Sequence, residues 1–360
     1  MTDFDTKSDP FSQLDTLDKH KIFEAICAQP NQLLGNYADS MAEDIVADTY
    51  ARDGRDIRNI VLAGMGGSAL AGEIARNWLA SRLSLPFEVV RQADLPAYVD
   101  DHSLVFISSA SGNTAETLAA LGDAARRDAN IIIMTSGGEL PEIAEMKHYR
   151  ILHIPPVTQP RFGVFSDLRA LACVLQDLEL SGGIDLRREL EDVANWLNAE
   201  KFALTPEAQG DNIAKTIALQ LRDQPVIVYG TPLTAAAAYK WKIDINENAK
   251  QLAWSNVYSE LNHNEFQGWI FPAEKHFAAV QLVGHFDSEA IQKRVRITTE
   301  MLGEHGFEPI LPAPRGETPL QQLLYFVLLG DFVSAYLGIL NGIDPTPVDM
   351  VEDFKKRLEQ

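Results

Sequence analysis

Residues 60–71 read Ile-Val-Leu-Ala-Gly-Met-Gly-Gly-Ser-Ala-Leu-Ala, and this stretch decides the fold class. The apolar run Ile60–Ala63 predicts a short buried strand. The glycines that follow let the chain turn tightly and bring its amides close to a ligand. Ser68–Ala80 is predicted to be a helix, and the free N–H groups and positive dipole at its start suit an anion. The stretch therefore predicts a strand, a turn and a helix with an anion site at the turn.

The same pattern recurs along the chain. Further strand-length runs rich in Val and Ile stand at Phe87–Val90, Leu104–Ser108, Ile131–Met134 and Ile151–Ile154, and later at Pro225–Tyr229, Ala278–Val283 and Glu308–Leu311. Helices are expected at Asn113–Arg127, Phe165–Leu180, Leu186–Phe202, Ala235–Ile245, Ser288–His305 and Leu320–Leu340. Continuous apolar runs are typical of parallel strands that are covered on both faces. We therefore expect an α/β fold with doubly wound parallel sheets, whose ligands bind beyond the carboxyl ends of the strands.

The predicted organisation has four segments. A helical N-terminal extension covers residues 1–56, and a first parallel-sheet domain covers 57–184. Connecting helices at 185–222 lead to a second parallel-sheet domain with C-terminal helices at 223–360.

Composition excludes several classes of protein. The chain has 360 residues with 31 basic and 51 acidic side chains, a net charge of −20, so it should repel nucleic acid and anionic membranes. The two cysteines, Cys27 and Cys173, are far apart, and the eight histidines form no metal-ligand motif. Disulfide scaffolds and metal sites are therefore not expected. Without a signal-peptide pattern or a run of about 18 apolar residues, we expect a cytoplasmic protein with no membrane partner.

Hydroxyl groups crowd a second strand-to-helix turn. Residues 106–117 read Phe-Ile-Ser-Ser-Ala-Ser-Gly-Asn-Thr-Ala-Glu-Thr. Ser111 or Asn113 is expected to cap the next helix, with Glu116 closing a capping box. A cap needs one hydroxyl and this turn has several, so the others indicate a cradle that holds a phosphate dianion with neutral donors. A well-capped helix without a ligand is the alternative. No nucleoside-triphosphate P-loop pattern is present.

The first turn has a competing interpretation. Gly64-x-Gly66-x-x-Ala69 fits the looser dinucleotide-binding fingerprint. That motif requires an acidic residue at the end of the next strand, where this chain has Arg91, with Asp94 just beyond. Arg91 suits a 2′-phosphate, so an NADP-dependent oxidoreductase is an alternative. It ranks second because it leaves the hydroxyl-rich turn unexplained.

The two turns, with three later motifs, resemble a known family. Gly64–Ser68 and Ser109–Thr117 resemble the sugar-isomerase (SIS) domain. The later motifs are Asn246-Glu247-Asn248-Ala249-Lys250, Glu260-Leu261-Asn262-His263-Asn264-Glu265 and Asp344-Pro345-Thr346-Pro347-Val348. Together they resemble the bifunctional phosphoglucose/phosphomannose isomerase family over about residues 58 to 358. The resemblance implies two SIS-type doubly wound parallel-sheet domains.

The resemblance also implies roles for individual residues. The substrate-binding positions are Gly66, Gly67 and Ser68 against the sugar, Ser109, Ser111 and Thr114 at the 6-phosphate, and Thr346 for tolerance of both C2 epimers. The catalytic positions are Glu247 as general base, His263 in ring opening from the partner subunit, Arg161 at the enediolate, and a C-terminal lysine. Lys355 and Lys356 are the candidates for that lysine, and we prefer Lys356. One departure is Ala110, where the family usually has tyrosine, which affects loop packing and the choice of substrate.

The predicted reaction follows from these roles. Aldose–ketose isomerisation moves a proton between C1 and C2 through a cis-enediol, and it needs a base, an oxyanion partner and a ring-opening group. The resemblance implies a homodimer that interconverts glucose 6-phosphate, and mannose 6-phosphate as a second aldose, with fructose 6-phosphate, without metal or cofactor. From residues alone, Glu247 can equally be a solvated helix residue, His263 a loop residue and Arg161 half of a surface ion pair. A non-catalytic phosphosugar-binding SIS regulator is a further alternative, although the first 55 residues lack a basic helix-turn-helix pattern.

Overall fold

The computed structural model describes residues 9–35 and 56–358. They form two compact units, which we call the central unit (Ala28–Asn198) and the terminal unit (Met1–Cys27 with Ala199–Gln360). Within the predicted N-terminal extension, the described residues form helices α1 (Leu14–Leu17) and α2 (Ile22–Gln32), and residues 1–8 and 36–55 lie outside the described part. The division of the chain into four segments stays a prediction.

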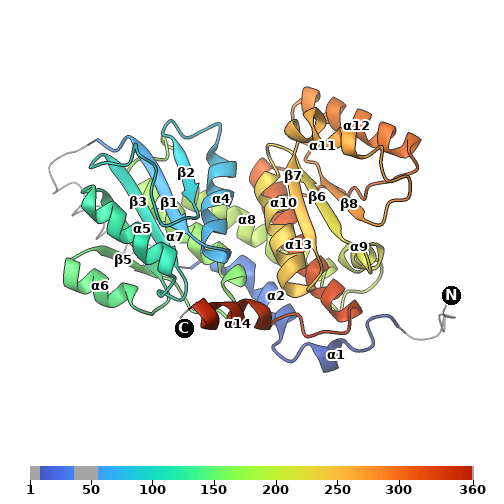
Figure 1. Ribbon diagram of the computed structural model, residues 1–360, viewed down its shortest axis with the longest axis horizontal. Coiled ribbons are helices and arrows are strands. Elements are labelled where there is room, and N and C mark those ends of the chain that lie inside the picture. Colours follow the sequence, from blue (N-terminus) through green and yellow to red (C-terminus); the bar gives the residue numbers. More distant parts are fainter. Residues whose placement is uncertain (1–8, 36–55, 359–360) are drawn as a thin grey trace. The chain divides into compact units, whose positions relative to one another are not determined.

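The central unit is built on a five-stranded parallel sheet with the order β2-β1-β3-β4-β5 (Figure 1). Its strands are β1 (Asn59–Gly64), β2 (Phe87–Val90), β3 (Ser103–Ser109), β4 (Asn130–Thr135) and β5 (Arg150–His153). Its helices are α4 (Gly67–Leu79), α5 (Ala115–Arg126), α6 (Leu140–Lys147), α7 (Val164–Asp177) and α8 (Leu186–Glu200). All five predicted strands are confirmed, and because they are parallel their carboxyl ends lie on one edge of the sheet.

The two faces of this sheet are covered by different helices. Alternate residues of β1, β3 and β4, such as Val61, Val105 and Ile133, form one core cluster with α5 and α6. The opposite face packs on α4, where a Cβ added to Gly72 would lie 3.1 Å from Leu62. Right-handed crossovers place α4 and α5 on opposite faces, because the chain winds in opposite directions from β1 and β3. The topological switch point, where such sheets bind ligands, therefore lies between the ends of β1 and β3.

The terminal unit contains a smaller parallel sheet with the order β7-β6-β8. Its strands are β6 (Val226–Gly230), β7 (Ala253–Val257) and β8 (Ala278–Leu282). Its longer helices are α9 (Ile213–Leu221), α10 (Ala235–Asn248), α12 (Glu289–Glu304), α13 (Pro319–Leu340) and α14 (Asp349–Leu358). The structure confirms the predicted strands at β6 and β8. It adds β7, which the sequence reading missed.

The predicted strand at Glu308–Leu311 is wrong. The structure has an isolated parallel bridge there, in which Ile310 donates to the Ala279 carbonyl and accepts from the Gln281 N–H, both at 2.8 Å. Pro309 and Pro312 flank Ile310 and carry no N–H, so the segment cannot extend the ladder.

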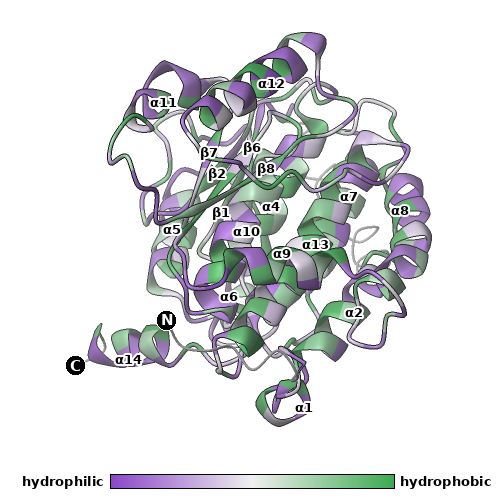
Figure 2. Cartoon of the chain, turned by 90° about the vertical axis from the view of Figure 1, so that its right-hand side faces the viewer, coloured by the Kyte–Doolittle hydropathy of each residue, from purple (hydrophilic) through white to green (hydrophobic). Residues whose placement is uncertain are grey.

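Helix α13 forms the core of the terminal unit. With 22 residues, the helix is long and apolar enough to cross a membrane, and it is the one helix of this kind in residues 9–35 and 56–358. This apolar segment is completely buried inside the fold, as is usual for a core helix. By contrast, α12 exposes hydrophilic residues along much of its length (Figure 2). The structure thus confirms the helix predicted at 320–340 and shows that it packs inside the fold.

Candidate active site

Glycines in the first turn bring it against the end of β3. A Cβ on Gly64 would lie 2.9 Å from the Ser108 carbonyl oxygen, a distance that side chains essentially never reach. Gly66 has a φ of +52°, in the left-handed region that favours glycine. Ser68, at the start of α4, accepts a hydrogen bond from the Ala110 N–H at 3.1 Å. The two turns predicted from the sequence are therefore joined at the switch point of the sheet.

The second turn gathers three hydroxyl groups. The Ser109 Oγ lies 3.1 Å from the Thr114 Oγ1 and 3.4 Å from the Ser111 Oγ, and the last two oxygens are also 3.4 Å apart. Gly112 makes this close cluster possible. Its φ is +68°, and a Cβ there would lie 1.7 Å from the Gly137 carbonyl oxygen.

The predicted cap of α5 is wrong. Thr114 is the N-cap residue, and no side chain caps the helix. Ser111 instead accepts from the Asn113 N–H at 3.3 Å, and the Asn113 Oδ1 accepts from the Glu139 N–H at 2.8 Å. Glu116 is in the first turn of α5 without closing a capping box. The hydroxyl cluster therefore stands at a helix start whose N–H groups are not taken by a side-chain cap, and this arrangement can bind a phosphate dianion.

Arg161 lies beside the first turn in the central unit. It belongs to the 3-10 helix η1 (Pro160–Phe162), is only 1% exposed, and donates to the Gln159 Oε1 at 3.2 Å. A Cβ on Gly67 would lie 2.8 Å from the Arg161 backbone nitrogen. Gly67 thus allows the start of α4 to pack directly against η1. A guanidinium is a group of the kind that can stabilise an oxyanion.

Arg91, which the dinucleotide alternative needs, is engaged elsewhere. Its Nη2 lies 2.7 Å from the Oε1 of Glu73, which is itself 9% exposed. Arg76 bonds the other oxygen of the same carboxylate. This network ties β2 to α4, and it favours the phosphosugar interpretation over the NADP alternative.

The corresponding turn of the terminal unit is closed by its own carboxylate. By strand order, the turn between β8 and α12 is the equivalent of the turn between β3 and α5 in the central unit. Here the Asp287 Oδ2 accepts from the Gly284 N–H at 2.8 Å, and Thr231 and the Leu233 N–H also bond this carboxylate. Burial raises the pKa of Asp287, while these donors oppose the shift. The turn of the terminal unit thus holds a carboxylate of the chain itself, where the turn of the central unit has the hydroxyl cluster.

Glu247 stands in the last turn of α10 and is half-buried. A buried ion cluster holds this helix against α13: Lys240 lies 2.8 Å from Asp244 and 2.5 Å from Asp331, and all three side chains are 0% exposed. Burial alone would lower the pKa of Lys240, but the two carboxylates raise it. The Asn248 side chain also bonds the Ser334 Oγ at 2.8 Å. The candidate base therefore stands on a firmly held helix.

Thr346 lies close to the end of α10. It is 4% exposed and follows α13, and its N–H donates to the Asp344 Oδ1 at 3.0 Å. Lys250, just beyond α10, donates to the carbonyl oxygens of Asp344 and Pro345. The structure thus brings together two of the motifs singled out in the sequence, residues 246–250 and 344–348.

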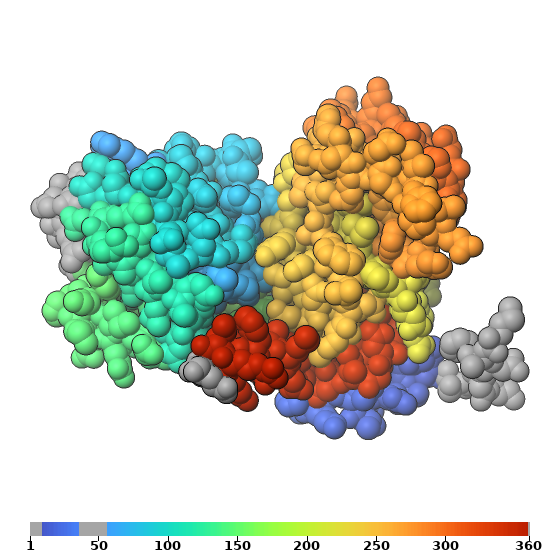
Figure 3. Space-filling view, in the orientation of Figure 1, coloured from blue at the N-terminus to red at the C-terminus, as the bar shows by residue number. Residues whose placement is uncertain are grey.

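The remaining candidates are on the surface. His263 ends the 3-10 helix η3 (Glu260–His263), its side chain is exposed, and no other residue in 9–35 or 56–358 bonds its ring. Lys355 and Lys356 are exposed on α14, and Lys355 pairs with Glu352 at 2.8 Å. Figure 3 shows the C-terminal segment that contains α14, in dark red, on the surface. Across the described residues, no group of three or more His, Cys, Asp or Glu side chains is arranged to hold a metal ion.

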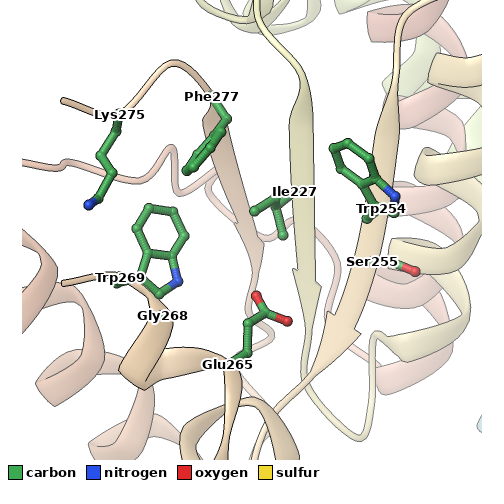
Figure 4. A pocket seen from close by; sticks show the side chains of 8 residues that line it. All are labelled: Ile227, Trp254, Ser255, Glu265, Gly268, Trp269, Lys275 and Phe277. Atoms are coloured by element: carbon green, nitrogen blue, oxygen red, sulfur yellow. The ribbon is translucent and has the colours of Figure 1, made fainter. Parts of the chain in front are cut away.

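Glu265, which was not among the predicted site residues, lines a cavity of about 470 Å³ in the terminal unit. Figure 4 shows its carboxylate between Ile227 and Trp269, with Trp254 and Phe277 among the walls. Helix α11 (Glu265–Gly268) begins at this residue. Its carboxylate accepts hydrogen bonds from the Tyr229 hydroxyl and, at 2.6 Å, from the Asn256 amide. Its place in the 260–265 motif was the only sequence signal.

Comparison with known families matches both halves of the chain. Residues 55–166 match the SIS domain, and residues 210–358 match the bacterial phospho-glucose isomerase C-terminal SIS domain. A bifunctional phosphoglucose/phosphomannose isomerase of Aquifex aeolicus is 35% identical over 87% of this chain and 94% of its own length. The enzyme of the same name from Caldicellulosiruptor bescii is 34% identical over 94% of this chain and 99% of its own. A D-glucosamine-6-phosphate 4-epimerase of Sulfolobus acidocaldarius is 32% identical over 64% of this chain and 68% of its own.

Solved structures with lower identity share the fold. The tagatose-6-phosphate ketose/aldose isomerase of Escherichia coli superposes with a TM-score of 0.68 at 19% identity, over 90% of this chain and 95% of its own. The C-terminal domain of glucosamine-fructose-6-phosphate aminotransferase from Francisella tularensis gives a TM-score of 0.68 at 17% identity, over 91% and 96%. These likenesses show that this chain shares its fold with both of these proteins.

Proposed function

Because this chain belongs to the bifunctional phosphoglucose/phosphomannose isomerase family, and so is an isomerase, we propose that it interconverts fructose 6-phosphate with glucose 6-phosphate and with mannose 6-phosphate. The observation that carries the proposal is the cluster of Ser109, Ser111 and Thr114 hydroxyls at the uncapped start of α5. Neutral hydroxyls and helix N–H groups bind a phosphate dianion without adding charge. In this proposal they hold the 6-phosphate, and Gly66, Gly67 and Ser68 lie against the sugar.

The proposed chemistry is a proton transfer by Glu247. The carboxylate removes a proton from C1 of the open-chain ketose and returns it to C2, while the hydroxyl proton moves from O1 to O2. The intermediate is a cis-enediol, and Arg161 stabilises the negative charge that develops on its oxygens. His263 assists ring opening, and Lys356 contributes a further positive charge. No step requires a metal or a redox cofactor.

We further propose a homodimer in which His263 serves the site of the partner chain. The exposed ring of His263, which no other described residue bonds, supports this arrangement. Substrate binding then depends on residues of one chain and ring opening on a residue of the other. We also propose that the enzyme acts in the cytoplasm.

Replacement of the base tests the proposed mechanism. Glu247→Gln keeps the size and polarity of the side chain and removes its basicity. A positioned base contributes about 10²–10⁴ in rate, so turnover of fructose 6-phosphate should fall by at least about 100-fold. Binding of fructose 6-phosphate, measured by calorimetry, should be unchanged because the phosphate turn is intact. Glu304→Gln, at the exposed end of α12, is the matched control. Turnover within about twofold of the wild type would remove Glu247 as the base.

A further inference from the structure

Lys250 has an unfavourable backbone conformation for its residue type. Helix α10 ends at Asn248, Ala249 is its C-cap, and Lys250 follows with a φ of +52°. Glycine is usual at this position of a helix end, because a Cβ is crowded in the left-handed region. Non-glycine residues in this region persist where the surrounding structure holds them, and they cluster at functional sites. The side chain of Lys250 therefore needs an explanation.

The ammonium group of Lys250 is surrounded by carbonyl oxygens. It lies 3.0 Å from the Asp344 oxygen, 2.9 Å from the Pro345 oxygen and 3.5 Å from the Asn248 oxygen. Three acceptors match the three N–H donors of a lysine. Two of these acceptors are consecutive carbonyls of the segment that leads to Thr346. Lys250 therefore connects the end of α10 to this segment through its side chain.

Close packing supports the same connection. A Cβ on Gly338 of α13 would lie 2.7 Å from the Asn248 carbonyl oxygen and 3.1 Å from Pro345. The Asn341 amide donates to the Ala249 carbonyl at 3.0 Å. The end of α10, the end of α13 and residues 344–346 thus form one tightly packed junction. Glu247 is three residues before Lys250 in this junction.

We propose that Lys250 is a positioning residue that fixes residues 344–346 beside Glu247 and thereby sets the ratio of the two aldoses formed. This inference rests on the proposed function. Glucose 6-phosphate and mannose 6-phosphate differ only in the configuration at C2, so the face on which C2 receives its proton decides the product. Displacements of about 1 Å near a reacting centre can change rates by about 100-fold. A loosened junction therefore alters the two product-forming rates unequally.

Three substitutions of Lys250 separate the side chain from the backbone. Lys250→Gly relieves the strained conformation and removes the ammonium group, and Lys250→Met removes the ammonium group alone. Lys250→Arg keeps donors for the two carbonyls. His148→Gly is the matched control, because His148 ends α6 with a φ of +56° in the central unit. The readouts are the initial rates of glucose 6-phosphate and mannose 6-phosphate formation from fructose 6-phosphate, with kcat and KM for each.

We expect both Lys250→Gly and Lys250→Met to change the product ratio by at least about threefold and to lower kcat by about tenfold, with KM nearly unchanged. Lys250→Arg should recover part of the ratio, and His148→Gly should match the wild type. A wild-type ratio and kcat in Lys250→Gly or Lys250→Met would overturn the inference while leaving the proposed function intact. Wild-type protein that forms neither aldose would overturn the proposed function itself.

Discussion

At the scale of single residues, the buried carboxyl group of Asp167 has an unusually high pKa. It lies in the first turn of α7 and is 7% exposed, and its carboxyl group has no hydrogen-bond or ion-pair partner among residues 9–35 and 56–358. Loss of solvation raises its pKa to about 8. The folded protein therefore holds this carboxyl in its neutral form at pH 7, whereas the unfolded chain ionises it near pH 4.

The sign of the resulting pH dependence follows directly. Between about pH 4 and pH 8 the unfolded state binds fewer protons at this group than the folded state, so the stability of the fold decreases as the pH rises. Asp167→Asn removes this dependence. We expect its stability relative to the wild type to increase by about 2–4 kcal/mol from pH 4.5 to pH 8 in urea unfolding experiments. A difference that does not change with pH would show that Asp167 titrates normally.

Residue patterns predicted the hydroxyl-rich turn itself better than the hydrogen-bond partners of its residues. The crowding of hydroxyls at a strand-to-helix turn indicated a cradle, the family resemblance implied Ser109, Ser111 and Thr114 as its donors, and the structure does cluster these three. The predicted cap failed because Asn113 bonds Glu139, 26 residues later in the chain. A local capping rule cannot include a partner that only the fold brings close. Glu265 was missed for the same reason, since its partner Tyr229 is 36 residues away.

At the scale of elements, the contact between α10 and α13 organises the terminal unit. Gly330, Ser334 and Gly338 recur every four residues along one side of α13. A Cβ on Gly330 would lie 2.3 Å from the Trp241 ring, so only glycine allows this approach. The Trp241 indole also donates to the Phe326 carbonyl at 2.6 Å. The small side chains let α10 pack deeply, and the polar contacts fix its position along α13.

The buried ion cluster makes a prediction at this scale. Lys240→Met removes the ammonium group that bonds both Asp244 and Asp331, and leaves these two like charges buried without it. Breaking such a cluster costs about 3–5 kcal/mol, which chemical denaturation at pH 7 should detect. Replacement of all three residues, as Lys240→Met with Asp244→Leu and Asp331→Leu, should recover most of the loss. Lys242→Met, two residues along α10, is the control, and an equal small effect of both single substitutions would contradict this account.

Periodicity predicted the elements of the central unit closely, because β1, β3 and β4 are buried on both faces and have continuous apolar runs. It was less successful in the terminal unit. Strand β7 reads Ala-Trp-Ser-Asn-Val, and this mixed composition gave no strand signal. Conversely, Glu308–Leu311 has the apolar character of a strand, but Pro309 within it and Pro312 after it prevent a ladder. Sheet pairing in this unit depends on neighbours that a local pattern does not contain.

At the scale of the whole molecule, the proposed dimer can be tested by complementation. If His263 acts in the partner's site, a hybrid of Glu247→Gln and His263→Ala chains contains one site with both groups intact. Mixing the two inactive variants should then restore up to about half of the activity per mixed dimer, because one of its two sites is complete. Subunit exchange is verified separately by mass spectrometry of differently tagged chains. Verified exchange without any recovery would show that each chain completes its own site.

The most direct test of the central claim is an assay of the purified, chelator-treated protein with fructose 6-phosphate. Glucose 6-phosphate and mannose 6-phosphate are detected separately with coupling enzymes supplied after the chelator is removed. If the chain has the proposed isomerase activity, both aldoses form without added metal or cofactor. Folded protein that binds fructose 6-phosphate and yields neither aldose would contradict it.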